Sequence, residues 1–424
     1  MMKKSLLFSI LVLVSFSCMR HERKNQAEFH QINSLSNDTY NDLFFLNDDL
    51  KDKRIVQIGE SGHGMAEYFK LKTRLVKYLH QELGYNVIAV EGSLGDCSSA
   101  FMNIGSLNDT ILMKNCFYSA WNFKEALPLF SYIKSTQKSD NPLILTGFDN
   151  ISTGHYFPVF FKEVLAKIDT TKAKTFEYVD YGLSKFTNGG INKDNFEEQR
   201  KSILDSLLFC KKLVLNNGEL IRNQFSESEH IVELLIKSLD NIRSTMSIEK
   251  DEYSRETMER MRDAIMAENL IWLADSVYNG EKIIVWAHNA HVSKSYSKIS
   301  GLDSPFKRQG EYVHEKFTNQ VFTIGVYGYE GTAWAFFINK EYNFTPPSES
   351  SLEAQMKQSG YATSYLNLDK ISNNDSLLSW VYDTIPSYEW GRFEHRIVPV
   401  KHYNGIILID KISPPTKISE SNKP

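Results

Sequence analysis

The sequence contains little cysteine and has no strong net charge. Its 424 residues include four cysteines, too few for the disulfide framework of a small secreted domain. The formal net charge is -4, so the composition does not indicate a nucleic-acid-binding surface. With 42% hydrophobic and 24% charged residues, the chain is neither disordered nor a coiled-coil rod. Its length allows one large domain or two to three small ones. The composition excludes a collagen, a mini-protein and a polytopic membrane protein.

Several familiar motifs are also absent. The segment 59–64 reads G-E-S-G-H-G, which is not the dinucleotide fingerprint G-x-G-x-x-G. It is not a serine-hydrolase elbow G-x-S-x-G either, because His63 stands where the second glycine is needed. No Walker-type lysine follows it, no H-E-x-x-H occurs, and no cysteine has a C-x-x-C partner. These absences argue against a P-loop, a zincin site, structural zinc and thiol redox chemistry.

The N-terminus is typical of an export signal. Lys3 and Lys4 precede an apolar stretch that is too short to span a bilayer. The following Ser15-Phe16-Ser17-Cys18 resembles a bacterial lipobox, although Ser15 replaces the usual leucine. We therefore expect a lipoprotein signal peptide at 1–17, an acylated Cys18 as membrane anchor, and a tether over 18–33. The alternative is an ordinary secretory signal with an incidental cysteine. Both predict export to the bacterial cell envelope, facing the periplasm or on the outer membrane.

Three cysteines remain in the mature chain: Cys97, Cys116 and Cys210. An odd number cannot pair completely. The sequence leaves open whether Cys97 and Cys116 form a disulfide or whether all three are free and buried.

Short apolar runs alternate with helical stretches along much of the chain. The first run, 54–60, is followed by a periodic helical stretch at 65–84. Further runs occur at 86–91, 143–149, 282–288 and 321–327. Continuous β-branched runs between helices predict an α/β fold with a mainly parallel central sheet flanked by helices.

The stretch 155–280 interrupts this alternation. It contains no convincing strand, and its leucines recur at helical spacing. We expect a large all-helical insertion, or cap, over the active edge of the sheet. The α/β core is then divided into 34–154 and 281–413, and a flexible tail follows at 414–424.

Ionisable residues gather where the predicted strands end. These are Glu60 and His63 after the first strand, Glu91 at the second, Asp149 at the third, and His288 and His291 after the fourth. The carboxyl ends of parallel strands share one edge, which is where open α/β sheets bind ligands. Burying so many ionisable groups without a use costs stability. The pattern therefore predicts an active site at this edge.

Each motif also has a purely structural interpretation. The 60–63 segment reads as a turn, Glu91 as a partner of Arg74, and His288-x-x-His291 as core histidines. For the whole set, two kinds of chemistry stay open. A carboxylate can orient a neutral histidine that takes a proton from water, or the histidines and carboxylates can bind a metal.

The chain resembles the erythromycin esterase family over about residues 50–400. The matching segments are 59–64, 69–74, 83–91, 147–149, 262–269 and 286–291. A later segment, Gln309-Gly310-Glu311-Tyr312, departs from the family pattern because Gln309 stands where methionine is usual.

The resemblance implies a role for each matching residue. His63 is expected to be the general base that activates water, with Glu60 and Glu91 shaping and polarising its site. His288 and His291 are expected opposite, to position water or stabilise the oxyanion. The remaining three, Arg74, Arg262 and Asp149, are expected to bind substrate or provide electrostatic support.

The resemblance also implies hydrolysis of an ester or lactone, most specifically that of 14-membered macrolides, without a cofactor. The small-molecule substrate is the one partner expected besides the membrane. Trp121, Phe123, Tyr156 and Phe157 are candidate lining residues, with core packing as the other interpretation. Alternatives that stay open are a metal-dependent hydrolase acting on another ester and a non-catalytic small-molecule-binding lipoprotein.

Overall fold

The computed structural model describes residues 29–187, 196–226, 228–247, 254–301, 306–344 and 347–418. The expected signal peptide at 1–17 and the expected anchor Cys18 lie outside these residues. Within them, no helix combines the length and apolar character needed to cross a membrane.

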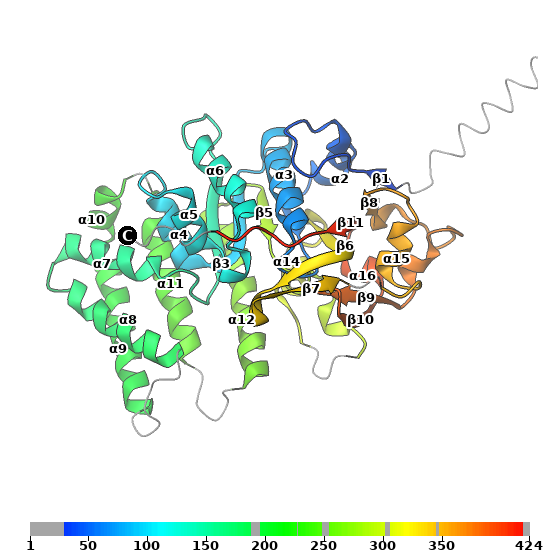
Figure 1. Ribbon diagram of the computed structural model, residues 1–424. Helices are drawn as coiled ribbons and strands as arrows, with labels where there is room; N and C mark the ends of the chain where they lie inside the picture. The colour runs from blue at the N-terminus through cyan, green and yellow to red at the C-terminus, as the bar shows by residue number, and fades with distance from the viewer. Residues whose placement is uncertain are drawn as a thin grey trace, which may run out of the picture.

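A mostly parallel sheet runs through the molecule (Figure 1). Its order is β1 (His30–Gln31), β8 (Thr363–Asn367), β11 (Gly405–Ile412), β6 (Val321–Ala335), β2 (Ile55–Ile58), β5 (Ile283–Trp286), β3 (Val87–Ser93) and β4 (Ile144–Asp149). The six strands from β11 to β4 are parallel, which confirms the predicted fold class. Two antiparallel strands, β8 and β1, extend one edge, and β7 (Lys340–Phe344) pairs with the far end of β6.

The central strands are buried on both faces, as the unbroken apolar runs predicted. In β5, Ile283 and Val285 pack into one hydrophobic cluster, whereas Ile284 and Trp286 pack into another on the opposite face. All five predicted strands exist. The five strands at residues 340–412 were missed, although β11 contains the apolar run 406–409.

The main helices before the insertion are α3 (Ala66–Leu83), α4 (Leu94–Met102), α5 (Asp109–Cys116) and α6 (Leu127–Thr136). Those after it are α13 (Asn289–Val292), α14 (Gln309–Phe317), α15 (Leu352–Lys357) and α16 (Pro399–His402). Helix α3 ends where Gly84 adopts φ 68°, a left-handed conformation that glycine accepts without steric cost. Cys97, Cys116 and Cys210 are buried free thiols.

The described part of the insertion is helical and forms its own hydrophobic cluster. It comprises α7 (Tyr156–Ile168), α8 (Ala173–Thr187), α9 (Phe196–Asn216), α10 (Gly218–Gln224), α11 (Ile231–Met246) and α12 (Arg255–Trp272). Figure 1 shows α7 to α11 as a bundle at one end of the molecule, whereas α12 lies apart from it and contacts β4 and α14. The bundle packs on α4 rather than over the edge formed by the carboxyl ends of the strands. The expected cap is therefore wrong for α7 to α11.

The expected boundaries of tether and tail also change. His30 and Gln31 pair with β8, and Ile32 is buried, so the last residues of the expected tether belong to the sheet. Thr416 donates hydrogen bonds to Glu125 and Lys417 bridges Phe123, so the tail stays ordered beyond 414. Residues 419–424 lie outside the described chain.

Arg74 fastens the N-terminal segment to α3. Its guanidinium binds the Asp42 carboxylate and donates to the backbone carbonyls of Ser34, Asn37 and Thr39. The arginine side chain is 2% exposed. This arrangement satisfies a buried charge almost completely, because several oxygens accept from one planar donor group.

Replacing Arg74 with methionine should lower the free energy of unfolding by about 3 kcal/mol, because Asp42 would lose its buried partner. Urea titration measures the change. Lys77→Met on the same helix is the control, since its partner Asp38 is exposed and the expected loss is about 1 kcal/mol or less. A folded Arg74→Met protein with unchanged stability and lost activity would contradict this structural role.

Candidate active site

Four neighbouring strands deliver the predicted residues to one edge of the sheet. The residues after β2 supply Glu60 and His63, and those after β5 supply His288 and His291. Glu91 lies within β3 and Asp149 ends β4. Because β2, β5, β3 and β4 are consecutive in the sheet, the six side chains form one continuous row. The structure thus brings them together as the strand pattern predicted.

Glu60 orients His63. The carboxylate is buried, and its Oε1 lies 2.8 Å from His63 Nδ1. Its Oε2 accepts from Lys72 Nζ at 2.9 Å, and Trp121 Nε1 also donates to Oε1. Burial raises the pKa of Glu60, but Lys72 and His63 outweigh burial and leave this pKa below its usual value. The ionised Glu60 accepts a hydrogen bond from the Nδ1–H of His63. The lone pair of the neutral imidazole is therefore on Nε2.

The glycines of 59–64 let protein segments meet behind His63. A side chain at Gly59 would place its Cβ 2.1 Å from Asn289 Oδ1. Gly64 has φ 86°, and its backbone oxygen accepts from the amide of Trp334 at 2.9 Å. These glycines therefore serve close packing between chain segments.

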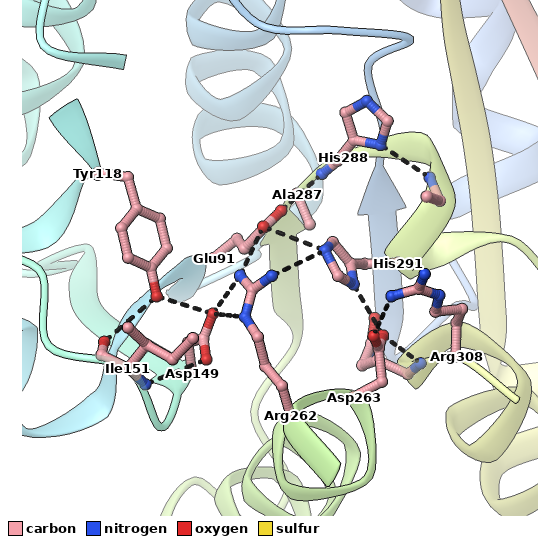
Figure 2. A network of polar contacts seen from close by, with 12 residues as sticks. Glu91, Tyr118, Asp149, Ile151, Arg262, Asp263, Ala287, His288, His291 and Arg308 are labelled. Atoms are coloured by element: carbon pink, nitrogen blue, oxygen red, sulfur yellow. Dashed lines mark hydrogen bonds and ion pairs between the residues drawn. The ribbon is translucent and has the colours of Figure 1, made fainter. Parts of the chain in front are cut away.

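A second network surrounds Glu91 and Arg262 (Figure 2). Arg262, from α12, binds Asp149 through Nε at 2.8 Å and Glu91 through Nη2 at 2.9 Å. The other Glu91 oxygen accepts the backbone N–H of His288 at 2.9 Å. Burial raises the pKa of Glu91, but His291 and Arg262 outweigh it and hold this pKa well below its usual value. Glu91 therefore fixes the β5 turn and does not contact His63 in the way that Glu60 does.

His291 lies between two carboxylates. Its Nδ1 is 2.7 Å from Asp263 Oδ1, and its Nε2 is 3.3 Å from Glu91 Oε1. Burial lowers the pKa of His291, but Asp263 and Glu91 outweigh burial and raise it to about 9. His291 is consequently a cation at neutral pH, and Arg308 balances Asp263 from the other side at 2.7 Å.

His288 is the neutral counterpart of His291. Its Nδ1 accepts the backbone N–H of Ala290 at 3.1 Å, so the proton of the neutral ring is on Nε2. Burial, together with the nearby His63, holds the pKa of His288 well below its usual value. The His63 and His288 rings lie edge to face, with centroids 5.2 Å apart.

These groups line a cavity of about 310 Å³. Its walls include His63, Glu91, Glu259, Arg262, His288, His291, Tyr296, Arg308, Glu389, Trp390, Phe393 and His395. Trp390 lies on the turn between β9 (Ile385–Glu389) and β10 (Phe393–Ile397) and packs against both His63 and His288. Among the described residues, no group of three or more His, Cys, Asp or Glu is arranged to hold a metal ion.

One expectation about the cleft is wrong. Arg74 is not in the site, because positions two apart on a helix face different directions and Lys72 occupies the inward face. Of the four candidate aromatic lining residues, Phe123 and Phe157 are core, as the core-packing interpretation predicted. Tyr156 packs beside the core, and Trp121 contacts both Glu60 and His63. The aromatic wall instead comes from Tyr296, Trp390 and Phe393.

Sequence reasoning also missed several site residues. Lys72 had a signal, because it lies three residues after Phe69 on the apolar face of α3 and a lysine there needs a buried partner. Asp263 lies beside Arg262 in a matching segment but had no assigned role. Arg308 and Glu389 had no signal, since only tertiary packing brings them to the edge.

Three comparisons place the chain among known proteins. The erythromycin esterase family model matches residues 80–412. The chain is 31% identical over 396 residues to YbfO of Bacillus subtilis, which is named as a hydrolase without a stated substrate, covering 89% of this chain and 88% of that protein. It is 22% identical over 409 residues to erythromycin esterase type II of Escherichia coli, covering 89% and 94%.

Solved structures share the fold. A Bacillus cereus protein superposes with a TM-score of 0.71 at 20% identity, covering 92% of this chain and 97% of that chain. An erythromycin esterase mutant in its open conformation superposes with a TM-score of 0.61 at 14% identity, covering 92% and 100%.

The cationic His291 predicts a pH-dependent stability. A folded-state pKa of about 9, above the ordinary value, stabilises the fold fully below about pH 6.5 and loses this effect as pH rises through about 9. Between about pH 6 and pH 9.5 the wild type should lose about 3 kcal/mol more unfolding free energy than His291→Asn. Urea titrations at both pH values measure the difference. Equal losses in the two proteins would show that His291 does not carry the charge.

Proposed function

The chain belongs to the erythromycin esterase family, and we propose that it hydrolyses a carboxylic ester or lactone with a water molecule activated by His63. Family membership and the hydrolase name of a 31% identical relative support a hydrolase. The contact between Glu60 and His63 is the observation that carries the mechanism, because it leaves the basic Nε2 of a cavity-lining histidine free.

The other side of the cavity suits the developing negative charge. Attack of water on a carbonyl carbon places charge on the carbonyl oxygen, and donors that are already oriented stabilise that charge best. His288 offers an Nε2 proton, and the cation of His291 lies three residues further along the same turn. Glu91 accepts the backbone N–H of His288, and Asp263 binds the ring of His291. Both histidines are thus held in place, so little reorganisation is needed during the reaction.

His63→Asn should reduce kcat for ester hydrolysis by a factor of about 10³ or more, because the variant lacks the base. His155→Asn is the matched control. That exposed histidine has φ 63°, a conformation that asparagine accepts, and it lies outside the cavity lining. Circular dichroism checks the fold of both variants. Retained turnover in folded His63→Asn protein would contradict the mechanism.

A chelator-treated, metal-free enzyme is expected to keep full activity, and its inactivation would favour a metal-dependent hydrolase instead.

The proposed substrate is a bulky macrolide, most specifically a 14-membered macrolactone. The cavity has room for about ten water molecules, which suits the reacting ester but not a large molecule as a whole. Beside it lie exposed apolar side chains: Phe393 is 61% exposed, and Phe337, 82% exposed, lies 6.3 Å from the Trp390 ring. An apolar ring system resting on these residues would cover surface that otherwise stays in water.

A panel of 14- and 16-membered macrolides tests this substrate class. The 14-membered compounds should gain one water, detected by mass spectrometry, in wild type but not in His63→Asn. Phe393→Ser should raise KM for such compounds with little change in kcat, because it removes binding surface away from the reacting atoms. Turnover of small esters without any macrolide hydrolysis would retain the esterase assignment and reject the macrolide.

A further inference from the structure

Glu389 presents a buried carboxyl group to the cavity without a matching cation. It is the last residue of β9, is 6% exposed and belongs to the cavity wall. Its Oε2 lies 3.3 Å from His288 Nε2, yet neither atom has a hydrogen-bond partner among the described residues. Such unpaired buried polar atoms are expensive, and an active site is where they find a use.

The surrounding chain holds Glu389 in this position. The next residue, Trp390, has φ 58°, a conformation that costs stability for a bulky side chain. The Trp390 amide donates to the Ser61 carbonyl at 2.6 Å, and its carbonyl accepts from Tyr342 at 3.0 Å. The hairpin is therefore tied to the Glu60–His63 turn on one side and to β7 on the other, and Glu389 lines the same cavity as His63.

The surroundings favour the neutral acid. Burial first, and then the carboxylates Glu353 and Glu60, raise the pKa of Glu389 well above its usual value, while His291 opposes them weakly. His288, the ring in direct contact, is neutral. Four tyrosines, Tyr68, Tyr296, Tyr327 and Tyr403, also interact electrostatically with Glu389, and the pKa of each is raised, so these side chains are neutral.

We propose that Glu389 is the general acid of the reaction, giving its carboxyl proton to the leaving alkoxide oxygen. The role rests on the proposed ester hydrolysis. His63 removes one proton from water as the new C–O bond forms. When the bond to the leaving oxygen breaks, its electron pair stays on that oxygen, which takes the Glu389 proton to become the alcohol. The His63 proton then returns through cavity water to the Glu389 carboxylate, and the acid product ionises to solvent.

Leaving groups of different basicity provide the test. A strongly basic alkoxide needs the acid, whereas 4-nitrophenolate leaves without it. For butyrate esters, Glu389→Gln should lower kcat about 10²- to 10³-fold on the ethyl ester and less than about threefold on the 4-nitrophenyl ester. In the wild type, turnover of the ethyl ester should also fall at high pH, because Glu389 ionises. The pH–rate profile of Glu389→Gln should lack this decline. Glu394→Gln, which changes an exposed carboxyl on the same hairpin outside the cavity lining, is the control and should show neither effect.

Each alternative result has a distinct meaning. Equal losses on both esters, or the same leaving-group dependence in Glu394→Gln, would overturn the general-acid role while leaving ester hydrolysis intact. Absence of any His63-dependent hydrolysis would instead overturn the proposed function. Infrared difference spectra of the resting protein test the protonation state without a substrate. They should contain a protonated carboxyl band that Glu389→Gln lacks, and its absence would overturn the inference independently.

Discussion

The buried ionised carboxylate of Glu60 is the constraint on which the rest of the site depends. A carboxylate taken out of water costs several kcal/mol unless donors surround it. Here Lys72, His63 and Trp121, from three different segments, supply those donors. The same contacts fix the His63 ring and its tautomer. The carboxylate that needs stabilising is therefore also the group that orients His63.

The other charged side chains at this edge of the sheet are likewise paired with groups of opposite charge. Glu91, Asp149 and Asp263 neutralise Arg262, Arg308 and the protonated His291, while His288 and Glu389 stay uncharged. Two histidines three residues apart thus differ in charge because their surroundings differ: His291 has two carboxylate neighbours, and His288 accepts a backbone N–H. A site built in this way offers an oriented histidine, a neutral hydrogen-bond donor and a cation within one small cavity.

Much of this arrangement was readable from the sequence. Apolar runs that end in Glu60, Glu91, Asp149 and His288 predicted both a parallel sheet and the edge where these residues meet, because parallel strands align their carboxyl ends. The predictions failed where local pattern is weak. Arg74 was misplaced because Lys72, not Arg74, lies on the face of α3 that meets the sheet. The bundle of α7 to α11 was expected over the site because helical spacing does not determine which surface the helices pack against.

The sequence by itself determined which residues stand at the strand ends, since that depends on order along the chain. Only the tertiary structure decided which charges those residues carry and what covers them. Lys72 meets Glu60 across a helix–sheet contact, and the hairpin with Glu389 and Trp390 reaches the site more than 300 positions after His63. Protonation depends on burial and on neighbouring charges in space, and these arise from packing between distant segments.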